Sequence, residues 1–234
     1  MPSWGIHLTT ASAVAEKIKI MNKNDFIIGN FLPDAESYVI KDFSIFVPYD
    51  ISHFAKKLKI NGVEEKLPDY MSFINKYKQN LNNPILLGYL THLITDYYWN
   101  NLTFSKYTAS NENGEVIGVL INETDFVGGD KELRRILKQK DFANFDNEVL
   151  QTKAYKMPEI TNDIINELNV IEETKYNSTD IEKILNYLEI MIKMKKQANL
   201  ENYTMFTKER INEYYEESIE FIVNILNDIL YKFN

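Results

Sequence analysis

Two side chains in an apolar stretch of this sequence carry the first sign of chemistry. His92 and Asp96 lie four residues apart within GYLTHLITDYYWN (88–100), where most neighbours are apolar. Residues with this spacing share one face of a helix, so both side chains can point at one common atom. A buried polar group is costly unless it has a partner, and a metal ion would take a lone pair from each residue. The alternative interpretation is an ordinary His–Asp contact inside the core.

Three more residues offer ligand atoms of the same kinds. His7 lies in WGIHLTT, Asp34 ends GNFLPD and His53 lies in DISHFAKK; each alone is typical of a cap, a turn or an amphipathic position. The sequence has no cysteine, so a metal must bind to histidine, carboxylate or backbone ligands. These five potential ligands are too many for one tetrahedral zinc with an open position. They suit two metals that share a carboxylate, as in two-metal phosphatases and nucleases.

The order of these motifs is characteristic. Trp-x-x-His near the start, then GNFLPD, SHF and GYLTHLITD resemble the bacterial zinc-dependent phospholipase C family. That family shares its fold with single-strand-specific zinc nucleases. The resemblance covers about the first 100 residues. It implies an all-α enzyme with a zinc cluster at the base of a cleft between helices.

The resemblance implies a role for each of the five residues. Asp34 corresponds to a zinc-ligating carboxylate with a general-base role, and His53 to the next imidazole on the same zinc. His92 and Asp96 resemble the family's His-x-x-x-Asp pair, in which the carboxylate is shared between two zincs. His7 resembles the N-terminal-region histidine on the neighbouring zinc.

The sequence departs from the family pattern in two ways. In secreted members a mature N-terminal tryptophan ligates zinc through its amine, whereas Trp4 here follows three other residues. The family's third zinc uses two histidines and a glutamate after the His-x-x-x-Asp pair, and no histidine follows His92. We therefore expect one or two zinc ions, with the third site absent rather than rebuilt from Glu123 or Asp125.

Local signals predict the elements that position these residues. Helices are expected to begin at Thr9 or Thr10, at Asn24 or Asp25 (ending at Pro33), at Pro68 (68–81), and at Pro84 (ending near Trp99). Apolar periodicity predicts further helices at 131–139, 141–155, 159–173, 179–199 and 207–233. Gly, Asn and Ser punctuation predicts one long loop or hairpin insertion near 105–130. The expected fold is a single all-α, multi-helix domain of the phospholipase C/nuclease type over residues 1–234.

Composition narrows the classes of partner. The formal net charge is -8, which disfavours broad nucleic-acid binding because that depends on basic residues. The N-terminus lacks the pattern of a signal peptide, and no apolar run reaches the roughly 20 residues that span a bilayer. A cytoplasmic protein without a transmembrane segment is expected. The oligomeric state stays open.

These observations favour a zinc-dependent phosphoric ester hydrolase. A metal-activated water, positioned or deprotonated by Asp34, would attack the phosphorus of a phospholipid head group or small phosphoester. The alternative is a non-catalytic binding or structural protein on the same helical scaffold, with a reduced or absent metal site. A phosphohydrolase of the His-Asp type is disfavoured because the sequence contains no His-Asp dipeptide.

Overall fold

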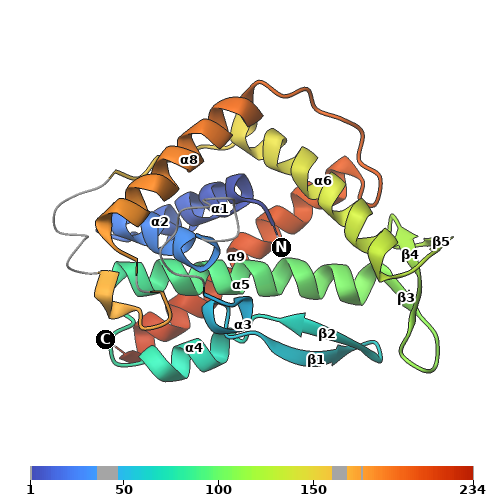
Figure 1. Cartoon of the computed structure of the whole chain (residues 1–234), viewed down its shortest axis with the longest axis horizontal. Helices are drawn as coiled ribbons and strands as arrows, with labels where there is room; N and C mark the ends of the chain where they lie inside the picture. Colours follow the sequence, from blue (N-terminus) through green and yellow to red (C-terminus); the bar gives the residue numbers. More distant parts are fainter. Residues whose placement is uncertain (1, 36–46, 160–167, 175, 234) are drawn as a thin grey trace.

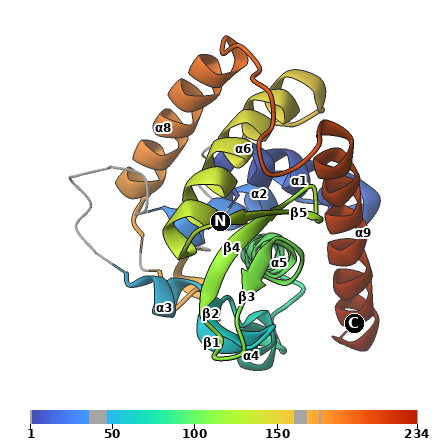
Figure 2. The same ribbon diagram turned by 90° about the vertical axis from the view of Figure 1, so that its right-hand side faces the viewer.

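One long helix runs through the centre of the protein. The computed structural model describes residues 2–35, 47–159, 168–174 and 176–233. Helix α5 (Pro84–Lys106) crosses the middle of Figure 1, and Figure 2 views it end-on among the other helices. Every residue from 85 to 96 is buried. A helix that is apolar on all sides is stable in water only when other elements enclose it.

The remaining helices supply that enclosure. Their bounds are α1 (Trp4–Lys17), α2 (Lys23–Phe31), α3 (Tyr49–Ser52), α4 (Tyr70–Tyr77), α6 (Lys131–Thr152), α8 (Ser178–Lys196) and α9 (Lys208–Phe233), with 3-10 helices η1 (Leu32–Asp34) and η2 (Leu168–Val170). Buried apolar residues from α1 to α9 form one continuous core. The predicted helical fold is confirmed. No helix of the described segments is both long enough and apolar enough to cross a membrane.

Two small antiparallel sheets complete the fold. Strands β3 (Thr108–Ser110), β4 (Val116–Ile121) and β5 (Asp125–Gly128) pair in that order. They form the hairpin insertion predicted near 105–130. Strands β1 (Lys56–Ile60) and β2 (Val63–Leu67) form a second hairpin that was not predicted. Its turn is Asn61–Gly62, both with positive φ, and this dipeptide is a strong hairpin signal.

Close contact between α2 and α5 sets the position of the metal-ligand candidates. A Cβ atom on Gly88 would overlap the carbonyl oxygen of Phe26, and one on Gly29 would overlap that of Ile85. The two backbones therefore meet directly, which only glycine allows. The contact brings Asp34, at the end of the 3-10 helix that follows α2, up to the face of α5 that carries His92.

Several predicted helix boundaries were wrong. Helix α1 begins at Trp4 rather than after Thr9 or Thr10, with Ser3 as its N-cap. A distant side chain supports this early start, because Asp146 of α6 accepts the N–H of Ile6 at 2.8 Å. The two residues are 140 positions apart, so the sequence around Ile6 could not predict this contact.

Other boundaries shifted for local or packing reasons. Helix α2 begins at Lys23, because Asn22 caps it instead of Asn24 or Asp25. Helix α4 is shorter than 68–81 and is capped by Asp69. Helix α5 continues beyond Trp99 to Lys106, and α6 is one helix across the expected break near 140. Of the helix predicted at 159–173, residues 160–167 lie outside the described segments.

Candidate metal centre

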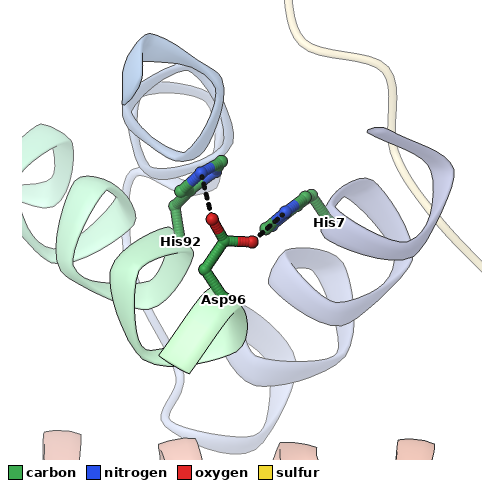
Figure 3. A group of neighbouring side chains, drawn as sticks. All are labelled: His7, His92 and Asp96. Carbon is green, nitrogen blue, oxygen red and sulfur yellow. Dashed lines mark ion pairs between the residues drawn. The ribbon is translucent and has the colours of Figure 1, made fainter. Parts of the chain in front are cut away.

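The five candidate ligands come from four separate segments and meet at one point. His7 lies in the second turn of α1, Asp34 ends η1, His53 follows α3, and His92 and Asp96 lie one turn apart on α5. Their side chains are 0–1 % exposed. Figure 3 shows His7 and His92 approaching Asp96 from two different helices.

Asp96 contacts histidines with both carboxylate oxygens. Its Oδ1 lies 3.3 Å from Nε2 of His7, whereas its Oδ2 lies 3.4 Å from Nε2 of His53 and 3.7 Å from Nε2 of His92. An imidazole nitrogen has one lone pair, but a carboxylate offers two oxygens. Asp96, whose two oxygens lie near all three histidines, is therefore suited to connect two ions.

Asp34 lies close to two of the same histidines, His53 and His92. Its Oδ1 lies 3.3 Å from His53 Nε2, and its Oδ2 lies 3.9 Å from His92 Nε2. The two imidazole Nε2 atoms are 3.2 Å apart. Two groups of potential ligands result, His7–His92–Asp96 and Asp34–His53–His92.

These separations fit a zinc site better than a network of hydrogen bonds. Charge-assisted N–H···O bonds are about 2.7–2.9 Å long, whereas ligand atoms about 2.0–2.1 Å from a tetrahedral zinc lie about 3.3 Å from one another. Both carboxylate oxygens of Asp34 and of Asp96, and both ring nitrogens of His7, lack a hydrogen-bond partner among the described residues. Buried orphaned acceptors at this spacing fit a bound cation.

Neighbouring groups hold two of the imidazoles in place. His92 Nδ1 donates to the backbone carbonyl of Asn30 at 2.8 Å, which leaves the Nε2 lone pair facing the cluster. His53 Nδ1 pairs with the Ser52 hydroxyl at 2.9 Å, and the Tyr49 ring stacks on the His53 ring with centroids 4.1 Å apart. Such outer contacts fix the tautomer and orientation of metal-binding histidines.

Electrostatics keeps the metal-free cluster attractive to a cation. Burial opposes ionisation of Asp34 and Asp96, yet the neighbouring histidines outweigh it and hold the pKa of both carboxyls below the usual range. Burial and the nearby His7 lower the pKa of His92 to about 3. Burial disfavours the charged form of His53, but the negative charges of the nearby Asp34 and Asp96 carboxylates raise its pKa to about 9. At neutral pH both carboxylates are charged and His92 is a neutral ligand.

Other residues that the sequence singled out lie elsewhere. Trp4 is buried against the rings of Phe31 and Tyr187, with centroids 5.3 and 5.4 Å away. Glu123 binds Arg210 at 2.8 Å at the turn between β4 and β5, and Asp125 is exposed at the start of β5. Neither carboxylate belongs to the metal-ligand groups of the described residues.

Sequence reasoning missed the residues that support the ligands. Ser52 precedes His53 directly, and Asn30 lies inside GNFLPD, so both were adjacent to recognised motifs. Asp146 had no comparable signal. It is buried on α6, where its Oδ1 accepts the Ile6 N–H beside His7 and its Oδ2 lies 2.7 Å from Lys195 Nζ.

Comparison with known proteins gives one match. A sequence profile described as zinc dependent phospholipase C matches residues 6–123, about half of the chain, and this range contains all five candidate ligands. Comparisons with curated proteins and with solved structures returned no match.

Proposed function

Because the chain belongs to the zinc-dependent phospholipase C family, we propose that it is a zinc-dependent phosphoric ester hydrolase. Its substrate would be a phospholipid head group or a small phosphoester. The observation that carries this proposal is the spacing of buried ligand atoms around Asp96, 3.3–3.7 Å, in the absence of hydrogen-bond partners for its carboxylate among the described residues.

Each of the five residues has a place in this proposal. Asp34, His53 and His92 would hold one zinc ion, His7 would hold a second, and Asp96 would bind both. Bound zinc supplies Lewis acidity that activates water and stabilises charge on the phosphoryl group. The contacts of His92 with Asn30 and of His53 with Ser52 keep both Nε2 atoms directed at the cluster.

Asp34 is the residue proposed to move a proton. Its lowered pKa keeps it ionised at neutral pH, so it can accept a proton from the attacking water. Its Oδ1 lies 3.3 Å from His53 Nε2, and its Oδ2 lies 3.9 Å from His92 Nε2. The acidic chain makes a nucleic-acid substrate unexpected. The cytoplasmic location stays a prediction.

One observation favours the alternative of a metal site without catalysis. All five side chains are 0–1 % exposed, and four pockets elsewhere among the described residues are lined by other side chains. A closed site with four protein ligands is typical of a structural zinc, whereas a catalytic site keeps one position open. The two functions therefore differ in whether a phosphoester reaches the metal.

Metal content and hydrolysis together test the proposal. We expect about one or two zinc ions per chain by inductively coupled plasma mass spectrometry, and turnover of a chromogenic phosphodiester that disappears with zinc. His92→Ala should lose both the metal and the activity. Thr95→Val, a buried near-isosteric change on the same helix, should keep both.

The outcomes separate the two functions. Zinc without turnover of any phosphoester would favour the structural role. A wild-type chain that retains no zinc after supplementation, with circular dichroism showing it to be folded, would exclude the hydrolase.

A further inference from the structure

A pocket outside the metal centre is lined by four cationic side chains. Its volume is about 540 Å³, and its lining residues come from the start of α6, the end of α5 and the start of β4. These three elements meet at the right-hand side of Figure 1. The cations are Lys131, Arg134, Arg135 and Lys138. The chain as a whole has a formal net charge of -8, so four cationic side chains around one pocket contrast with its overall acidity.

The two acidic residues in the pocket wall are already engaged within α6. Asp130 caps the helix, because its Oδ1 accepts the N–H groups of Glu132 and Leu133, each at 3.0 Å. Glu132 pairs with Arg135 through both oxygens, at 2.8 and 2.5 Å. Neither acidic residue therefore forms an ion pair with Lys131, Arg134 or Lys138.

Two of those cations receive compensation from outside the helix. Arg134 donates to Glu65 at 2.9 Å and to the Thr108 hydroxyl at 3.0 Å. Lys131 donates to the Glu64 carbonyl at 2.9 Å and lies 3.5 Å from a Glu65 oxygen.

Lys138 differs from its neighbours because it is buried and, among the described residues, has no carboxylate at ion-pair distance. It is 7 % exposed, and its Nζ donates to the neutral Asn100 side chain at 3.1 Å. The rings of Phe104 and Phe142 lie 5.4 and 5.9 Å from the same nitrogen. Among the described residues no carboxylate lies within 4 Å of it. An ammonium group has three N–H donors, so Lys138 retains donors for a ligand in the pocket.

We propose that this pocket binds a small oxyanion of the phosphate class, with Lys138 as its principal ligand and Lys131 and Arg134 as supporting charges. An oxyanion would provide the counter-charge that Lys138 lacks and would accept its remaining N–H groups. The Arg134 guanidinium is fixed over the Phe104 ring at 4.4 Å, so its charge is pre-positioned.

The pocket and the candidate metal centre involve neighbouring turns of the same helix, α5. Asn100, the partner of Lys138, lies one helical turn after Asp96, which corresponds to about 6 Å along the helix axis. If the proposed hydrolase function holds, the pocket therefore selects phosphoesters that carry a second anionic group about one to two helical turns from the reacting phosphorus. This part of the inference depends on that function, whereas oxyanion binding does not.

The first experiment isolates the pocket from the metal. The 234-residue chain, freed of zinc, is titrated with inorganic phosphate by calorimetry and by amide chemical shifts. We expect one Lys138-dependent site, with the largest shift changes in residues 131–138. Lys138→Met should weaken binding by about tenfold or more, because it removes a charge-assisted contact in a partly desolvated site. Lys140→Met removes the same charge from an exposed position on the same helix and should leave binding unchanged.

The second experiment distinguishes a free oxyanion from a group on the substrate. The zinc-loaded chain is given two phosphodiesters that differ by one additional phosphate group. We expect a preference for the doubly charged ester in kcat/KM that falls about tenfold in Lys138→Met. No preference, together with phosphate binding in the first experiment, would assign the pocket to a free oxyanion.

The failures of the two proposals are distinguishable. No hydrolysis of either ester would count against the hydrolase alone. Phosphate binding that is absent, or equal in wild type and Lys138→Met with both proteins folded, would overturn the oxyanion site.

Discussion

Ser52 supports the candidate metal centre through two different atoms. Its hydroxyl lies 2.9 Å from His53 Nδ1, and its backbone carbonyl accepts the Tyr89 hydroxyl from α5. The first contact orients the imidazole, and the second ties the segment after the short helix α3 to the central helix. Ser52 therefore fixes the proposed ligand His53 relative to α5.

We predict that Ser52→Ala weakens zinc binding by about 10- to 100-fold, the usual effect of removing an outer contact to a ligating histidine. Competition with a chromogenic chelator would measure the affinity. Ser218→Ala is the matched control, because Ser218 is also buried and donates to a backbone carbonyl, on α9. Equal zinc affinity in wild type and Ser52→Ala would show that stacking of Tyr49 alone orients His53.

The buried ammonium of Lys138 should make stability depend on alkaline pH. Burial, with a contribution from the nearby Arg134, lowers its pKa from 10.5 to about 8. Between these values the unfolded chain still holds a proton that the folded chain has released, so stability rises with pH. Below pH 8 both states hold the proton, and the cost of burying the charge is constant.

We therefore expect the free energy of unfolding of wild type, relative to Lys138→Met, to become more favourable as pH rises from about 8 to 10.5. Urea denaturation of both proteins in the absence of added phosphate would measure this difference. The same comparison with Lys140→Met in place of Lys138→Met should be flat over that range. A flat difference for Lys138→Met as well would mean that its ammonium is not desolvated.

The early start of α1 illustrates how one element depends on another. Ser3 is the N-cap, but its side chain makes no capping hydrogen bond. Asp146 of α6 takes over this task for the N–H of Ile6, and Lys195 of α8 balances the charge of Asp146 at 2.7 Å. Carboxylates stabilise helix N-termini through the helix dipole. The turn that carries His7 is thus held by two other helices.

The contact between α2 and α5 should tolerate no side chain at Gly88. A Cβ there would overlap the carbonyl of Phe26, so the helices must separate. We expect Gly88→Ala to destabilise the fold by about 1–3 kcal/mol and to weaken zinc binding, because Asp34 moves away from His92. Denaturant unfolding and a zinc titration would measure both effects.

Gly128→Ala provides a control for that experiment. An added Cβ at Gly128 meets no atom closer than 3.9 Å, so only a small change is expected. Unchanged stability and zinc affinity in Gly88→Ala would show that the two backbones have room to separate without disturbing the ligands.

Zinc should act as a cross-link for the protein as a whole. The proposed ligands lie on α1, η1, the segment after α3, and α5, so one cluster joins elements between residues 7 and 96. The folded state assembles this cluster and the unfolded chain does not. A ligand present at about 1,000 times its Kd adds about 4 kcal/mol to stability.

We predict that a chelator lowers the melting temperature by roughly 10 °C. Thermal denaturation followed by circular dichroism, with zinc and with chelator, would measure this shift. His92→Ala should show little further change on chelation. An equal melting temperature of the wild-type protein under both conditions would mean that the folded chain does not depend on the metal.

Local sequence pattern was sufficient to select the candidate metal ligands and to predict that most of the chain is helical. The four-residue spacing of His92 and Asp96 implied a shared helical face because helix geometry repeats over short distances. The caps and apolar periodicity located α8, α9 and the start of α5 to within a few residues. They placed the end of α5 too early and a break inside α6 that does not exist. The hairpin of β1 and β2 was not predicted, although the dipeptide Asn61–Gly62 is typical of a hairpin turn.

Contacts between residues far apart in the sequence were determined only by the packing of the helices. No local pattern could join Ile6 to Asp146, direct the two oxygens of Asp96 at different histidines, or place Lys138 beside Asn100. Periodicity constrains residues only a few positions apart, whereas these contacts exist because helices distant in sequence pack around α5. The candidate metal ligands are thus recognisable in local motifs, whereas the folded core determines their spacing, the contacts that orient His53 and His92, and the pocket at the start of α6.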